Sequence, residues 1–269
     1  MTEKTNRDGD LHGRVALITG ASRGLGAALA LELAKAGMKL VLASREGSRA
    51  ELERVAEQAR ALGAETLAVS ADVADRADVE RLAAEALGRF GRVDLLVNNA
   101  STLGPLPLPL LLDTPVEGFR AALETNLFGP FLLTRALAGQ MLARDAGLII
   151  NVTSDAAAVG YPHWGAYGVS KAALDQLTRV WAAELEGTGV GIAAIDPGSM
   201  NTVMHRDAEP DENPEEWADP AAIAPALALL ARADPRRVNG RRFEAQDRAA
   251  LAELRELAAS GVQTETSHV

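Results

Sequence analysis

Short apolar runs alternate along the chain with longer segments in which apolar positions recur every three or four residues. The short runs have few polar positions, which is typical of strands buried on both faces of a parallel sheet. They cover Val15–Thr19, Leu40–Ala43, Thr66–Val69, Leu95–Asn98, Leu148–Val152 and Gly191–Ile195. The longer segments predict helices at Leu25–Ala36, Arg49–Leu62, Asp75–Phe90, Gly118–Leu142 and Ala166–Leu185.

This alternation predicts an α/β fold, a doubly wound parallel sheet of the Rossmann type with helices on both faces. No Gly-, Ser- or Pro-rich linker divides the chain, so we expect one domain over residues 13–245, preceded by a polar tail at 1–12. Residues 246–269 are expected to form an added amphipathic helix, Asp247–Ala259, and a frayed end. Ser199–Pro220 is acidic and proline-rich, which is typical of a functional lid or an unstructured loop.

Composition narrows the classes of function. Lys and Arg number 27 against 37 Asp and Glu, a net charge of −10, which disfavours nucleic acid and anionic membranes as partners. The chain has no cysteine, and its four histidines are scattered, so no metal site is expected. It lacks a signal peptide and an apolar segment long enough to cross a bilayer, so a cytoplasmic location is expected.

A glycine-rich turn follows the first predicted strand, with the sequence Thr-Gly-Ala-Ser-Arg-Gly-Leu-Gly at 19–26. Gly20 allows the tight turn, Gly24 lets the backbone approach a diphosphate, and Gly26 allows close packing of strand and helix. The helix that follows offers free N–H groups and a positive dipole end to phosphates. A glycine-rich connection without a ligand is the alternative, but the position between strand and helix favours a dinucleotide site.

Two arginines indicate which dinucleotide binds. NAD sites usually carry an acidic residue about 20 positions past the loop, to bind the ribose 2′-hydroxyl. This chain has Arg45 there, and Arg23 stands inside the loop. A guanidinium can bind a 2′-phosphate with two hydrogen bonds, whereas a carboxylate would repel it. We therefore predict NADP(H), although two solvated surface arginines would also fit the pattern.

A tyrosine and a lysine four residues apart carry the predicted acid–base chemistry. Tyr167 and Lys171 share one face of a predicted helix, and an adjacent ammonium is expected to lower the pKa of the phenol. Such a pair can protonate an alkoxide or deprotonate an alcohol. Ser154 follows a buried strand, where parallel sheets gather ligands, and could hold a substrate oxygen. Its alternative is a turn or cap serine.

In these motifs the chain resembles the short-chain dehydrogenases/reductases (SDR) over roughly residues 13 to 245. The shared features, in order, are the glycine loop, Asp72, Asn98-Asn99-Ala100, Asn126, Ser154, Tyr167-Gly168-Val169-Ser170-Lys171 and Pro197 to Thr202. The resemblance implies an oxidoreductase that interconverts a carbonyl and a secondary alcohol with NADP(H). A homodimer or homotetramer is also expected from it.

The resemblance also implies roles for these residues. Tyr167 would be the general acid/base, Lys171 would bind the nicotinamide ribose, Ser154 would hold the substrate oxygen, and Asn126 would position a water through a backbone kink in its helix. The cofactor would contact Gly20, Ser22, Arg23, Gly24, Leu25, Gly26, Arg45, Asp72, Val73, Asn99, Ala100, Tyr167, Lys171, Pro197, Gly198 and Thr202. No metal is implied.

The chain departs from the family pattern at two places. Ser101 stands where the family usually has Gly, which could narrow the site or alter the following loop. The usual C-terminal strand and glycine pair are expected to be replaced by the sequence at 239–245 and the added helix. That end of the chain often takes part in tetramers.

Substrate contacts are expected from Ser101–Leu112, Tyr161–Trp164 and Ser199–Pro220. The Leu- and Pro-rich first segment and Trp164 favour an apolar carbonyl or alcohol, and the acidic residues of the third are interpreted as solvated carboxylates. His163 and His205 are interpreted as pocket polar groups at most. Two alternatives remain: an idle NADP(H)-binding sensor or scaffold, and a nucleotide-sugar epimerase or dehydratase, which normally needs a larger C-terminal region.

Overall fold

The computed structural model describes residues 11–260, which form a seven-stranded sheet whose neighbouring strands all run parallel. The strand order is β3-β2-β1-β4-β5-β6-β7. The bounds are β1 Val15–Thr19, β2 Lys39–Ser44, β3 Thr66–Ser70, β4 Leu95–Asn98, β5 Gly147–Val152, β6 Val190–Asp196 and β7 Arg242–Glu244. The order reverses direction between β1 and β4, so loops from both halves meet at the carboxyl ends of these two strands.

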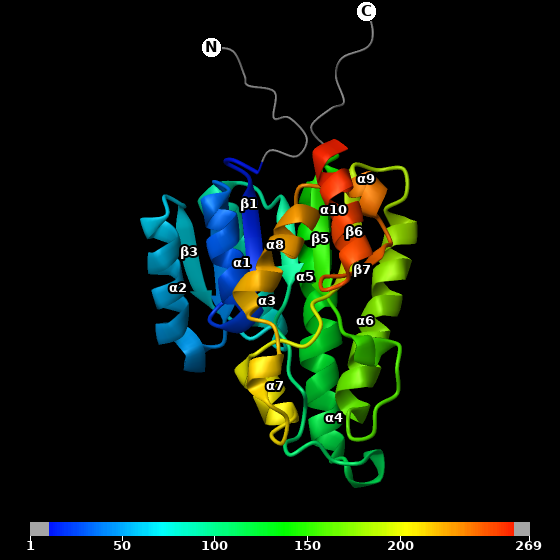
Figure 1. Ribbon diagram of the computed structural model, residues 1–269. Helices are drawn as coiled ribbons and strands as arrows, with labels where there is room; N and C mark the ends of the chain where they lie inside the picture. The colour runs from blue at the N-terminus through cyan, green and yellow to red at the C-terminus, as the bar shows by residue number, and fades with distance from the viewer. Residues whose placement is uncertain (1–10, 261–269) are drawn as a thin grey trace, which may run out of the picture.

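Helices cover both faces of the sheet (Figure 1). On one face lie α1 Gly24–Lys35, α2 Arg49–Ala61, α8 Pro220–Leu230 and α10 Arg248–Ser260. On the other lie α3 Arg76–Phe90, α5 Gly129–Leu142 and α6 Gly165–Glu184. The short helices are α4 Val116–Leu123, α7 Val203–Ala208 and α9 Pro235–Val238.

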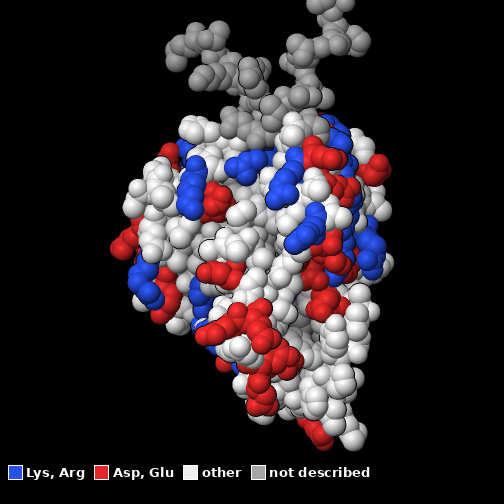
Figure 2. All heavy atoms as spheres, viewed as in Figure 1, with Lys and Arg blue, Asp and Glu red and all other residues white. Residues whose placement is uncertain are grey.

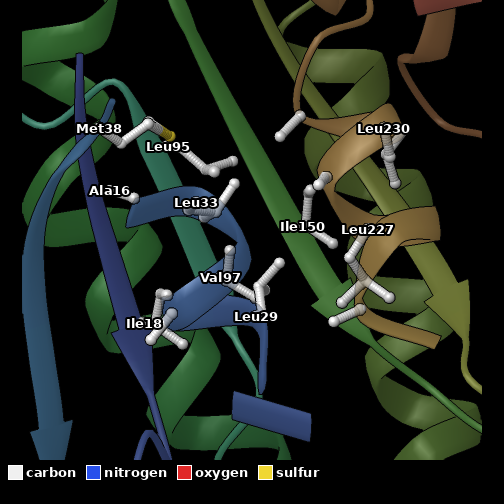
Figure 3. Close-up of a cluster of buried hydrophobic side chains, with 14 of the residues drawn as sticks. Ala16, Ile18, Leu29, Leu33, Met38, Leu95, Val97, Ile150, Leu227 and Leu230 are labelled. Atoms are coloured by element: carbon white, nitrogen blue, oxygen red, sulfur yellow. The ribbon is translucent and has the colours of Figure 1, made fainter. Parts of the chain in front are cut away.

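The larger core lies between the sheet and the α1/α8 layer (Figure 3). Leu29 of α1 and Leu227 of α8 are at most 1% exposed, and they pack over Val97 and Ile150 of the central strands. Complete burial of one such side chain contributes roughly 1.5–3 kcal/mol. This packing fixes the sheet, and therefore the loops at its carboxyl edge.

All six predicted strands are present, with bounds within one residue of the prediction at each end. The predicted helix Gly118–Leu142 is not a continuous α-helix. It consists of α4, a π-helical turn at Glu124–Phe128, and α5. Ser199–Pro220 is more ordered than its composition indicates, because α7 and a 3₁₀ turn at Pro214–Glu216 form within it.

The expected replacement of the last strand is wrong. Arg242–Glu244 forms β7 and pairs in parallel with β6, although it has only three residues and an arginine at its start. The added helix is present as α10, and its Leu254 and Leu257 join the core beneath α8. Between residues 11 and 260, no helix is long and apolar enough to span a membrane.

Candidate active site

The glycine loop joins β1 to α1 in a conformation that side chains would prevent. Gly20 has φ of +65°, and a Cβ on it would lie 2.9 Å from the Cα of Ala100. A Cβ on Gly26 would collide with the carbonyl oxygen of Gly20. Arg23 precedes α1 and makes no side-chain cap, so the first N–H groups of the helix are available to an anion. This local structure fits a diphosphate.

Asn99 and Thr19 hold the loop in place. The Asn99 amide donates to the carbonyl oxygens of Thr19, at 2.8 Å, and Gly20, at 3.2 Å. The Thr19 hydroxyl accepts the backbone N–H groups of Asn99 and Ala100 at 3.1 and 3.0 Å. The Asn99 side chain thus braces the loop, and its place along the cofactor stays a prediction. Thr19 was not singled out from the sequence.

The residues expected to bind the adenosine end of the nucleotide are Arg23 in the glycine loop, Arg45 after β2, and Asp72 and Val73 after β3. Arg23 and Arg45 are both exposed, and neither forms an ion pair with another residue in the 11–260 range. An Asp72 carboxylate oxygen accepts the backbone N–H of Ala74 at 3.0 Å, which shapes this loop. Val73 is buried against Gly129. Two unpaired guanidinium groups near a glycine loop fit the 2′-phosphate of NADP(H).

Asn126 lies inside the π-helical turn and is completely buried. Its Nδ2 donates to the Thr102 carbonyl at 2.8 Å and to Ser170 Oγ at 2.9 Å. Its Oδ1 accepts the Thr102 N–H at 2.9 Å and Ser101 Oγ at 3.1 Å. The expected kink is present, but both donors and both acceptor positions of the amide are used within the protein. A water bound to Asn126 would therefore have to contact an atom outside its side-chain amide.

Tyr167 and Lys171 lie on α6 and are 9% and 2% exposed. The Lys171 ammonium stands 5.5 Å from the centre of the Tyr167 ring and donates to the Val152 carbonyl at 2.8 Å. Burial lowers the pKa of Lys171 to about 8, and the carboxylates of Asp175 and Asp196 oppose that shift. Lys171 therefore changes charge close to neutral pH.

Burial raises the pKa of the Tyr167 phenol well above its ordinary value. Hydrogen bonding with Ser154, and to a smaller extent with Ser101, opposes this rise in pKa. The nearby carboxylates of Asp196 and Asp155 add to the rise. The direction is opposite to the lowering expected from Lys171, whose ammonium is directed at a main-chain carbonyl. In this arrangement Tyr167 is a protonated acid at neutral pH.

Ser154, Tyr167 and the loop after β6 surround one cavity of about 310 Å³ at the carboxyl ends of β5 and β6. Of the predicted residues, Ser154, Tyr167, Pro197, Gly198 and Thr202 line it. Asn126 and Lys171 are not among the lining residues. The expected substrate segments also contribute, through Leu103, Tyr161, Trp164 and residues 199, 200, 204, 205, 209 and 212.

Of the two histidines near the cavity, only His205 lines it. Its ring packs edge-on against Trp217 with centres 4.3 Å apart, and burial lowers its pKa. His163 is exposed and contacts the Leu108 carbonyl at 3.1 Å. His163 therefore supports the Leu/Pro-rich loop.

Sequence reasoning missed two side chains here: Asp155, which lines this cavity, and Arg242, which contacts two residues that line it. Asp155 accepts the hydroxyl of Ser154 at 3.0 Å and the hydroxyl of Tyr161 at 2.9 Å. Arg242 of β7 reaches the carbonyl of Ser154 and the carboxylate of Asp196. Asp155 could have been suspected from its place beside Ser154. Arg242 could not, because β7 was not predicted.

The fold and this site are those of a dinucleotide-dependent oxidoreductase of the Rossmann class, and comparison with known proteins gives the family. The family model described as short chain dehydrogenase matches residues 14–213, and the chain belongs to that family. It is 41% identical over 194 residues to a 3-oxoacyl-[acyl-carrier-protein] reductase of Synechocystis, covering 72% of this chain and 77% of that protein.

Two further proteins illustrate the range of the likeness. A 2-(R)-hydroxypropyl-CoM dehydrogenase of Xanthobacter autotrophicus is 37% identical over 238 residues, 84% of this chain and 94% of that one. A short chain dehydrogenase of Escherichia coli, solved in complex with NADPH, superposes with a TM-score of 0.80 and 29% identity, covering 89% of this chain and 99% of that one. The named activities differ, so the family does not fix the substrate.

Proposed function

We propose that the protein is an NADP(H)-dependent oxidoreductase that interconverts an uncharged carbonyl compound and its secondary alcohol, with Tyr167 as the general acid/base. The observation that carries the proposal is the single cavity that Tyr167, Ser154, Pro197 and Gly198 all line. A buried, protonated phenol next to a hydroxyl is suited to give a proton to a carbonyl oxygen as it becomes an alkoxide.

Ser154, Tyr167 and Lys171 have different proposed roles in the reaction. When bound, NADPH supplies a hydride for the carbonyl carbon. The Ser154 hydroxyl hydrogen-bonds the substrate oxygen, and Tyr167 transfers its proton to that oxygen. The Lys171 ammonium, held by Val152, contributes positive charge beside the Tyr167 ring. Alcohol oxidation runs through the same groups in reverse.

The preference for NADP(H) is proposed from two unpaired cations. Arg23 and Arg45 are exposed near the glycine loop and have no carboxylate partner within residues 11–260. The NADPH complex of the Escherichia coli relative supports this assignment, because that chain shares the fold.

The charge of the cavity favours an uncharged substrate over an anionic one. Asp155, Asp196, Glu209 and Glu212 line it, and none of its lining residues is Lys or Arg. Glu209 is held by the Trp164 indole N–H at 3.0 Å, and Glu212 by that of Trp217 at 3.2 Å. Figure 2 shows acidic side chains gathered over α7 and the loop that follows it. Two carboxylates of the Ser199–Pro220 segment, Glu209 and Glu212, thus line the cavity and are not only solvated surface groups.

The test is a panel of ketones, aldehydes and quinones with NADPH and NADH, in which each neutral ketone is paired with the keto acid of the same carbon skeleton. The proposal expects reduction with NADPH and at least a tenfold higher kcat/KM for the neutral member of each pair. No turnover with any compound would favour an idle cofactor-binding protein. Preferred reduction of the keto acids would contradict the charge argument alone.

A further inference from the structure

Glu209 directly follows α7, which lies beyond the carboxyl ends of the strands, and it lines the proposed substrate cavity (Figure 1). Its main chain is fixed, because the Glu209 N–H donates to the His205 carbonyl at 2.9 Å and ends the helix. Its side chain is fixed too, because Oε1 accepts the indole N–H of Trp164 at 3.0 Å, across 45 positions of sequence. This half-buried carboxylate therefore has a defined place in the cavity.

Trp164 contacts both Glu209 and the proposed acid. Its ring packs edge-on against the Tyr167 ring, with centres 5.5 Å apart and an angle of 68° between the planes. Trp164, Tyr167 and Glu209 all line the same cavity. A substrate whose carbonyl oxygen meets Tyr167 therefore has the Glu209 carboxylate one indole ring away from its reacting end.

The second carboxylate oxygen of Glu209 is available to a bound molecule. Between residues 11 and 260, Oε2 accepts no hydrogen bond and the carboxylate forms no ion pair. The lining residues in that range include no Lys or Arg. Burial lowers the pKa of His205, the one basic side chain of the lining, so it supplies little positive charge at neutral pH. A carboxylate has about four acceptor positions, so it can still hold a donor group of the substrate.

The cavity also offers an apolar wall for a carbon skeleton. Leu103, Ala156 and Met204 line it. Leu103 and Ala156 belong to the same buried cluster as Tyr167, and Met204 packs against that cluster. Sites of this kind bind the body of a ligand through apolar contacts and fix its orientation through a few polar groups. Glu209 is such a polar group, separate from those proposed to act on the carbonyl.

We propose that Glu209 is a specificity-determining residue that accepts a hydrogen bond from a hydroxyl group of the substrate, distinct from the reacting oxygen. The preferred substrate is then a neutral hydroxylated ketone, and the product of its reduction is a diol. The inference rests on the proposed function, which places the carbonyl oxygen at Tyr167. A hydrogen bond to a charged acceptor is about twice as strong as one to a neutral acceptor, so a single hydroxyl can govern the choice of substrate.

Pairs of ketones test this assignment. Hydroxy ketones in which the hydroxyl stands at increasing distances from the carbonyl are each compared with the ketone that carries a methyl group in its place. With NADPH, the best hydroxy ketone should exceed its methyl partner about tenfold in kcat/KM, mainly through KM. Glu209→Gln keeps an oxygen for Trp164 but replaces the free oxygen by an amide NH₂, so the advantage should fall severalfold. Glu209→Met should abolish it, and the methyl partners should keep their rates in both variants.

Asp207→Asn is the matched control. Asp207 is an exposed carboxylate of α7 that does not line the cavity, and the variant loses the same charge. The ratio of each hydroxy ketone to its methyl partner should stay at the parent value. An equal fall of this ratio in Asp207→Asn and Glu209→Gln would assign the effect to net charge and overturn the proposal. Equal losses for both members of a pair in the Glu209 variants would also overturn it, because a structural role predicts that result.

Binding to the NADP⁺ complex separates failure of this proposal from failure of the proposed function. NADP⁺ has no hydride to give, so a ketone binds without being reduced, and calorimetry gives its Kd. The hydroxy ketone should bind about tenfold more tightly than its methyl partner, and Glu209→Met should remove this difference. If the protein reduces no ketone but shows the difference in Kd, the proposed function fails and the Glu209 site stands. If the protein reduces ketones but neither Kd nor kcat/KM favours a hydroxy ketone, only the Glu209 proposal is overturned.

Discussion

The Arg242 guanidinium donates to the main-chain carbonyl of Ser154 at 3.2 Å, across 88 positions of sequence. The same Nη2 binds Asp196 at 2.9 Å, and Nε lies 3.4 Å from a carboxylate oxygen of Asp175. Both carboxylates are 8% exposed and act on Lys171. Arg242 of β7 therefore contacts Ser154 directly and Lys171 indirectly, through the two carboxylates.

Arg242→Met should destabilise the protein and impair catalysis together. Removing the guanidinium leaves two buried carboxylates without their cation, which costs about 2–4 kcal/mol in the free energy of unfolding. We also expect a drop in kcat of about tenfold, because the Ser154 turn loses its support. Urea unfolding and initial rates measure the two effects. Arg236→Met is the control, because Arg236 forms an exposed ion pair with Asp145. Equal stability of the two variants would contradict the linkage.

The second prediction concerns the cofactor. Arg45→Asp should raise the KM for NADPH at least tenfold and improve the use of NADH, because a carboxylate repels a 2′-phosphate and can accept a ribose hydroxyl. Arg49→Asp makes the same charge change a few residues away, at an arginine that pairs with Glu46. Its NADPH/NADH ratio should change far less. An unchanged ratio in Arg45→Asp would refute the assignment.

The third prediction follows from the depressed pKa of Lys171. Its folded pKa of about 8 lies below the ordinary 10.5, so between these values the unfolded chain binds more protons than the native protein. Stability from this group is therefore missing below pH 8 and is gained as pH rises toward 10.5. Relative to Lys171→Met, the parent protein should gain about 1–3 kcal/mol over that window in urea unfolding. A constant difference would show that Lys171 is not buried as described.

The strands and most helices were predictable because buried parallel strands produce uninterrupted apolar runs, and covering helices produce periodic ones. β7 was not, since its three residues begin with Arg242 and have no such run. The apolar spacing did not predict the π-helical turn around Asn126, because this spacing does not differ from that of the α-helices beside it; the kink there was expected only from the family resemblance. Short helices such as α7, which has six residues, also lack the apolar stripe that periodicity detects.

The site was predictable as a set of positions but not as a network of hydrogen bonds. The spacing of Tyr167 and Lys171 gave their shared helical face. It did not reveal that Val152 holds the ammonium, or that burial and two carboxylates raise the pKa of the phenol. Those effects come from residues far apart in sequence, and they depend on the arrangement of β5, β6 and α6.

The central claim is the acid/base role of Tyr167, and Tyr167→Phe tests it most directly. The ring and its packing against Trp164, with centres 5.5 Å apart, are retained, and only the hydroxyl is lost. With the best substrate of the panel, kcat should fall at least a hundredfold. NADPH affinity, measured by calorimetry, should stay within a few-fold of the parent protein. Turnover at the parent rate, with the same pH profile, would contradict the role of Tyr167.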